Sequence, residues 1–210
     1  MPLIIMPVQT RLPRWLLTVA AVLTLGACVE AETELSFRTD QAGSLALTYR
    51  IDSRALQIGM FDSDAAILPL PLGRRDFEQT AAAHPGLELH SYRSRDENGT
   101  TRIEAEYRFA SIDALQTALG SRADLSLRQE GGSTILRQQL FGGFESEPGD
   151  RAASFAAEFF NDARFSMTVH APRTIESHTK GRVEGRTARI EYRAVELLAA
   201  EQPLVWELAW

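Results

Sequence analysis

Hydrophobic and polar residues alternate along several short stretches of this chain, with the period of two that is typical of β-strands. The pattern begins at residues 35–37 and resumes over residues 45–51, where every second residue is hydrophobic. Residues 40–43, which lie between these stretches, end in glycine and suit a turn. The sequence therefore predicts a first β-hairpin close to the start of the globular part of the chain.

A second hairpin is predicted from residues 87–92 and 103–109, which alternate in the same way. Asn98 and Gly99 lie between them. Both residue types accept a positive φ, so we expect a tight primed turn at this point.

Residues 125–127 and 135–141 predict a third hairpin around Gly131 and Gly132. Later hydrophobic residues at strand spacing predict the closing strands, of which the first ends at Pro172. These residues are Phe165, Met167 and Val169, then Val183, Ile190 and Tyr192, and finally Leu204, Trp206 and Leu208.

Helices are predicted between the hairpins. Ser111 can cap a short helix over residues 112–119, and Gly120 stands where a left-handed C-terminal residue belongs. A second helix is expected over residues 150–163 from apolar residues at helical spacing, and a third over residues 74–84.

Hairpins separated by single helices predict an α+β fold. We expect a mainly antiparallel sheet built from successive hairpins, with two or three short helices packed on one face.

The first 27 residues have the composition of an export signal. Arg11 and Arg14 precede an apolar run over residues 15–25, which is too short to span a bilayer comfortably. We therefore expect residues 1–27 to be a cleaved lipoprotein signal peptide and residues 28–210 to form a single domain.

Residues 25–28, Leu-Gly-Ala-Cys, resemble the lipobox of bacterial lipoproteins. Leu25, Gly26 and Ala27 would be recognised by the signal peptidase, and Cys28 would take the lipid and become the first mature residue. Cys28 is the only cysteine in the sequence, which excludes an intramolecular disulfide. The expected location is a cell membrane or outer membrane, with the domain on the extracytoplasmic side; Val29 is not the aspartate of the inner-membrane retention signal.

Charge argues against nucleic acid as a partner. Residues 1–27 carry two of the 22 basic residues and none of the 28 acidic ones, so the mature part has 20 basic and 28 acidic residues, formally −8. Such a surface repels phosphate backbones, and no stripe of Lys or Arg is visible in the sequence.

The sequence shows no catalytic signature. The four histidines have no metal-ligand spacing among them, and Asp62 and Asp64 lack the glycine and distal glutamate of a calcium loop. No nucleophile elbow or phosphate-binding loop occurs. We therefore expect no enzyme activity, no cofactor and no metal.

Two features could bind a lipid. Residues 65–73 form an apolar segment broken by two prolines, which could line a pocket or pack over the sheet edge; the latter is the favoured interpretation. The aromatic face of the helix over residues 150–163 could line a cavity, although ordinary core packing is again favoured. The candidate ligand-binding residues are Ile67, Leu68, Leu70 and Leu72 from the first feature and Phe155 and Phe159 from the second.

Most of residues 28–193 resemble the LppM-like family of actinobacterial and spirochaete envelope lipoproteins. The resemblance is carried by Cys28 with the hairpin that follows it, and by the segments 85–92, 107–115, 165–172 and 181–185. It implies an α+β domain that binds lipid or glycolipid at the membrane surface without catalysis. The alternative is an assembly module that docks an envelope protein through its sheet edges or the apolar segment.

Overall fold

Strands dominate the part of the chain that the computed structural model describes, which is residues 29–39, 41–53, 56, 71–119, 124–141, 163–198, 200 and 202–210. The strands are β1 (Glu30–Phe37), β2 (Gly43–Asp52), β3 (Leu87–Glu97), β4 (Thr100–Phe109), β5 (Leu125–Glu130), β6 (Ser133–Phe141), β7 (Arg164–His170), β8 (Ser177–His178), β9 (Arg182–Glu184), β10 (Thr187–Arg193) and β11 (Leu204–Ala209). The helices are α3 (Arg74–Ala83), α4 (Ile112–Leu119) and α6 (Ala194–Leu198).

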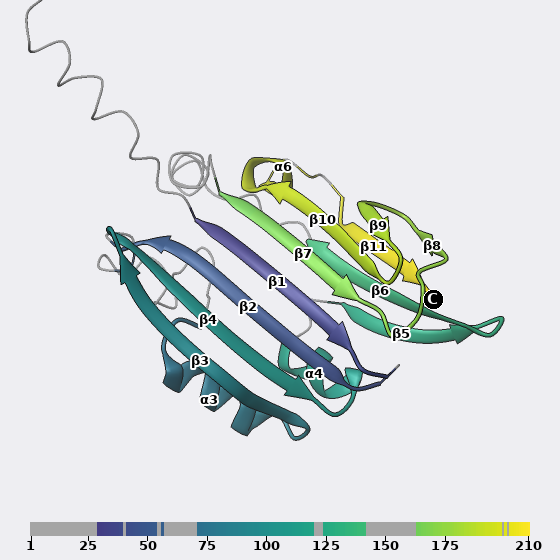
Figure 1. Ribbon diagram of the computed structural model, residues 1–210, viewed down its shortest axis with the longest axis horizontal. Helices are drawn as coiled ribbons and strands as arrows, with labels where there is room; N and C mark the ends of the chain where they lie inside the picture. The colour runs from purple at the N-terminus through teal and green to yellow at the C-terminus, as the bar shows by residue number, and fades with distance from the viewer. Residues whose placement is uncertain are drawn as a thin grey trace, which may run out of the picture.

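The strands form two sheets rather than the one that the sequence predicted. The larger sheet has seven strands in the order β3-β4-β2-β1-β7-β10-β9, and the smaller has four in the order β5-β6-β11-β8. All pairs in both sheets are antiparallel except β1 with β7, which run parallel in the middle of the larger sheet (Figure 1). The expected α+β class and mainly antiparallel pairing are confirmed.

Two of the three predicted hairpin turns lie wholly within the described residues, and both are present. Asn98 and Gly99 have φ values of 52° and 83°, so both adopt the positive φ that a primed turn requires. Gly131 and Gly132, with φ values of 60° and 92°, turn the chain between β5 and β6.

Two of the predicted helices lie within the described residues. Helix α4 spans the predicted residues, and the Ser111 hydroxyl accepts a hydrogen bond from the Ala114 amide at 3.2 Å. Helix α3 begins at Arg74 as predicted. The predicted helix over residues 150–163 and the cap at Gly120 lie outside the described residues, except for Ala163.

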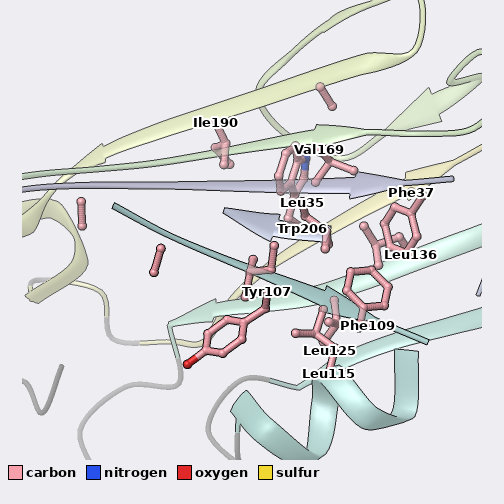
Figure 2. Close-up of a cluster of buried hydrophobic side chains, with 14 of the residues drawn as sticks. Leu35, Phe37, Tyr107, Phe109, Leu115, Leu125, Leu136, Val169, Ile190 and Trp206 are labelled. Atoms are coloured by element: carbon pink, nitrogen blue, oxygen red, sulfur yellow. The ribbon is translucent and has the colours of Figure 1, made fainter. Parts of the chain in front are cut away.

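The core lies where one face of the larger sheet meets α4 and the smaller sheet (Figure 2). We call this face the inner face, and the opposite one the outer face. Phe37 of β1 contacts Phe109 of β4 and Trp210 after β11, with ring centroids 5.9 Å and 5.5 Å apart. Leu115 of α4 and Leu136 of β6 are each 1% exposed in the same cluster. Burial at this junction stabilises the association of the two sheets.

Candidate functional site

The sequence-predicted site residues fall mostly beyond what the structure describes. Leu72 lies within the described residues. The others are outside them, namely Leu25, Gly26, Ala27, Cys28, Ile67, Leu68, Leu70, Phe155 and Phe159. The lipid attachment and the two predicted ligand-binding features therefore remain predictions.

Leu72 helps to hold the start of α3 against the sheet. Its carbonyl oxygen accepts a hydrogen bond from the Tyr92 hydroxyl at 2.7 Å, and its side chain is partly buried against the core. Asp76 in the first turn of α3 accepts hydrogen bonds from the amides of Leu72 and Gly73, at 3.3 Å and 2.9 Å. These bonds satisfy amides that the start of a helix leaves without partners. At this residue the structure shows packing over the sheet.

An aromatic cluster lies under α3. Phe77 is fully buried, with its ring centroid 5.4 Å from that of Tyr92 and 5.9 Å from that of Tyr107. The Tyr107 hydroxyl donates to the Phe77 carbonyl oxygen at 3.1 Å. Burial raises the pKa of Tyr49 and of Tyr107, because the charged phenolate would lose its hydration there. The cluster fixes α3 on the inner face, and burial favours the neutral form of both phenols.

Next to this cluster, the inner face carries apolar side chains that are only partly buried. The residues are Leu47 of β2, Phe165 and Met167 of β7, and Tyr192 of β10, and we call them the inner apolar patch. Leu47 and Met167 are both paired with Thr33 of β1, one on each side of it, so they lie in one row across the sheet. Phe165 pairs with Tyr192 in the next row.

The patch is more exposed than the next row of the inner face, although Ile190, which is paired with Met167, and Ala31, which is paired with Phe165, are buried. In the adjacent row Leu45, Leu35 and Val169 are 3%, 1% and 0% exposed. The patch thus marks a place where the inner face is less completely covered than at the junction with the smaller sheet. Its chemistry suits an apolar ligand, since three of its four side chains have no hydrogen-bonding N or O atom.

The outer face of the larger sheet is mostly polar, as expected for alternation with a buried inner face. At the end where β1 begins, one row of paired residues crosses six strands in the order Arg95, Arg102, Arg50, Glu30, Arg164, Arg193. We call these five arginines the arginine row. Sequence reasoning missed this basic stripe, because its five arginines come from five strands that span residues 43 to 193 of the chain.

Two outer or peripheral arrangements contain groups that hydrolases use. His170 lies 3.0 Å from Glu34 and 3.1 Å from the Thr187 hydroxyl, but the Glu34 and His170 side chains are 56% and 38% exposed on the open sheet face. A hollow of about 270 Å³ beside α4 is lined by residues that include His84, Ser111 and Asp113. No hydrogen bond joins these three, and Ser111 acts as the helix cap. Neither arrangement presents an activated nucleophile in a water-excluding site.

Within the described ranges, no group of three or more His, Cys, Asp or Glu side chains is arranged to hold a metal ion. None of the described helices has the length and apolar character that crossing a membrane requires.

The fold and its surfaces define an α+β domain with a two-sheet core, a partly exposed inner apolar patch and a polar outer face. This fold is similar to that of the folded domain of Mycobacterium tuberculosis LppM, solved by NMR, with a TM-score of 0.50 and 14% sequence identity. The match covers 88% of this chain and 90% of the mycobacterial domain. The LppM-like fold expected from the sequence is therefore confirmed. No protein-family model matches the chain, and no curated protein matches it.

Proposed function

We propose that this chain is a non-enzymatic envelope lipoprotein, anchored through acylated Cys28, whose domain binds lipid or glycolipid at the membrane surface. The lipobox at residues 25–28 supports the anchor. The observation that carries the binding function is the inner apolar patch, in a fold similar to that of a mycobacterial LppM domain.

The patch favours an acyl chain over a polar ligand. Leu47, Met167 and Phe165 offer aliphatic, thioether and aromatic surface, and Met adapts its shape to irregular apolar ligands. Burial raises the pKa of Tyr192, the fourth member of the patch, with a further contribution from Glu196, which favours the neutral phenol beside such a ligand. An acyl chain that covers about 100 Å² of this surface would gain about 2.5 kcal/mol.

Native mass spectrometry with lipid extraction tests this function on residues 29–210 exported to a periplasm. We expect a discrete additional mass that extracts as lipid. Met167→Gln places a polar group in the patch at nearly constant volume and should strongly reduce that mass. Thr168→Gln is the matched control, because the adjacent side chain points to the opposite, outer face and should leave bound lipid unchanged.

The experiment also separates lipid binding from misfolding. Circular dichroism should show that both variants keep the strand content of the unchanged domain. Equal lipid occupancy in the folded Met167→Gln and Thr168→Gln variants would refute the patch as the binding site. A clean apo mass of the unchanged domain would instead favour the assembly module.

The described sheet edge at β3 offers little to an assembly module. A bulge interrupts β3 between Leu89 and Ser91, and five of its last six residues, from Tyr92 to Glu97, are polar or charged. Bulges and charges of this kind are how natural proteins protect edge strands from pairing with another chain. Mild crosslinking would detect a protein partner of this kind. If the apolar segment takes part in docking, the partner should be lost when residues 67–72 are replaced by Gly and Ser.

A further inference from the structure

The arginine row on the outer face is a costly arrangement for a sheet. Arg102 is paired with Arg50 on one side and with Arg95 on the other, and like charges directly opposite each other repel. Glu30 separates Arg50 from Arg164, and Arg164 is paired with Arg193 on the next strand. The row therefore gathers positive charge in a domain whose formal charge is −8.

The charge changes sign along the strands. The next row, two residues further from the start of β1, contains Glu32, Glu104 and Glu191 with Arg93. On the other side of the row stand Asp52 and Glu97. The arginines still outnumber the carboxylates at this end of the sheet, whereas carboxylates outnumber arginines in the row that contains Glu32.

The row lies at the end of the sheet nearest the lipid attachment. Strand β1 begins at Glu30, which is itself part of the row, and Cys28 is two residues earlier. Two residues of fully extended chain span about 7 Å. If Cys28 is acylated, Glu30 in the middle of the row is therefore held within roughly one Debye length of the headgroups, about 8 Å at physiological salt. The arginines on the neighbouring strands follow at about 4.8 Å per strand.

We propose that the arginine row binds the phosphates of anionic lipid headgroups in the membrane that carries the anchor, and so fixes how the domain stands on that membrane. This inference rests on the proposed lipid anchor. Guanidinium groups pair with phosphate through two parallel hydrogen bonds, which suits them to headgroups better than a point charge. Arg50, Arg164 and Arg193 have side chains that are 44%, 62% and 61% exposed, so they can reach such a partner.

The competing partners of these arginines are weak. The guanidinium of Arg164 lies 3.7 Å from Glu191, and those of Arg50 and Arg193 lie 2.8 Å and 3.0 Å from Glu30 and Glu196. Exposed pairs of this kind add little stability. A phosphate in a layer of headgroups can replace or share them.

Arginine-selective modification tests the proposal on the full acylated chain in lipid vesicles. The protein is reconstituted into neutral phosphatidylcholine vesicles and into vesicles with about 30% phosphatidylglycerol. Each arginine's rate of reaction with phenylglyoxal is then measured by peptide mass spectrometry. We expect the rates of Arg50, Arg95 and Arg164 to fall about fivefold in the anionic vesicles, and to recover in about 1 M NaCl.

Arg108 and Arg182 are the internal controls. Both are exposed on the same sheet, and Arg108 is in the row of Ser44, about 20 Å along the strand from Arg102. Their rates should not depend on the lipid. The double variant Arg95→Gln with Arg164→Gln should abolish the protection of Arg50, and Arg108→Gln with Arg182→Gln should preserve it.

The outcomes separate this inference from the anchor. Protein that is washed off neutral vesicles would refute the acylated anchor and this inference with it. Anchored protein whose arginines all react equally in both lipids, or are all protected equally, would overturn the arginine row alone. Protection confined to the row supports the proposal.

Discussion

The ring centroids of Phe37 and Trp210 lie 5.5 Å apart, with their planes tilted by 44°. This contact joins β1 of the larger sheet to the residue that follows β11 of the smaller one. The backbone of Trp210 is fixed as well, since its amide and carbonyl exchange hydrogen bonds with Thr134 of β6 at 3.0 Å and 2.8 Å. The two sheets are thus locked together at the last residue of the sequence.

Trp210→Ala should destabilise the domain by about 3 to 5 kcal/mol, because it removes a large side chain that is 1% exposed and leaves a cavity against Phe37. Urea denaturation of the mature domain measures the change. Leu119→Ala is the control, since that side chain is 38% exposed and its loss should cost much less. Equal costs for the two variants would contradict a core that depends on the contact between Phe37 and Trp210.

Gly43→Ala should cost about 2 to 3 kcal/mol, because its Cβ would overlap the Ser36 carbonyl oxygen and approach the Phe109 ring to 2.7 Å. Gly99→Ala is the matched control: a Cβ there meets nothing within 4 Å, and only its positive φ is strained, at about 1 kcal/mol. Thermal unfolding ranks the two. A smaller effect at Gly43 than at Gly99 would show that β1 and β2 can separate without loss.

Stability should fall at alkaline pH because of the buried phenols. Burial raises the pKa of Tyr49 in the folded protein, whereas the unfolded chain ionises near 10. The unfolded state therefore loses protons first, and the stabilising contribution is intact below about pH 10 and is lost above it. Absorbance at 295 nm should show late phenol ionisation, and Tyr49→Phe should flatten the alkaline decline. Ionisation of all the tyrosines near pH 10 in the folded protein would contradict the burial.

Cys28→Ser should abolish incorporation of radiolabelled fatty acid and slow the removal of residues 1–27, since the lipidated cysteine is what the processing enzyme recognises. Val29→Ser is the control, because it changes the neighbouring residue and leaves the thiol in place. Unchanged labelling of the Cys28→Ser protein would refute the predicted anchor.

The hairpins could be predicted from sequence because the signals for their buried faces and for their turns each lie within a few neighbouring residues. Alternation over β2 and β4 identifies the buried residues, and Asn98 with Gly99 specifies the turn conformation that the structure has. Helix α4 was predicted for the same reason, since its cap and its apolar spacing lie within nine residues, Ser111 to Leu119.

What escaped prediction depends on which strands become neighbours. The division into two sheets and the parallel pair of β1 with β7 leave no local signal. Strand β8 has only two residues and α6 only five, too few to establish a period. The arginine row and the inner apolar patch exist only once strands from distant parts of the chain lie side by side, so neither could be predicted from the sequence alone.

The parallel pair of β1 and β7 also has a consequence for how the protein reaches its folded state. Each residue from Glu30 to Ser36 is paired with the residue 134 positions later. Contacts of such long sequence separation form late and make folding slow. If the chain is exported from its N-terminus, β1 leaves the translocation channel first and must wait, unpaired on the β7 side, for the rest of the sheet to follow. We therefore expect periplasmic chaperones to matter most during this interval, when the central strand of the larger sheet is still an open edge.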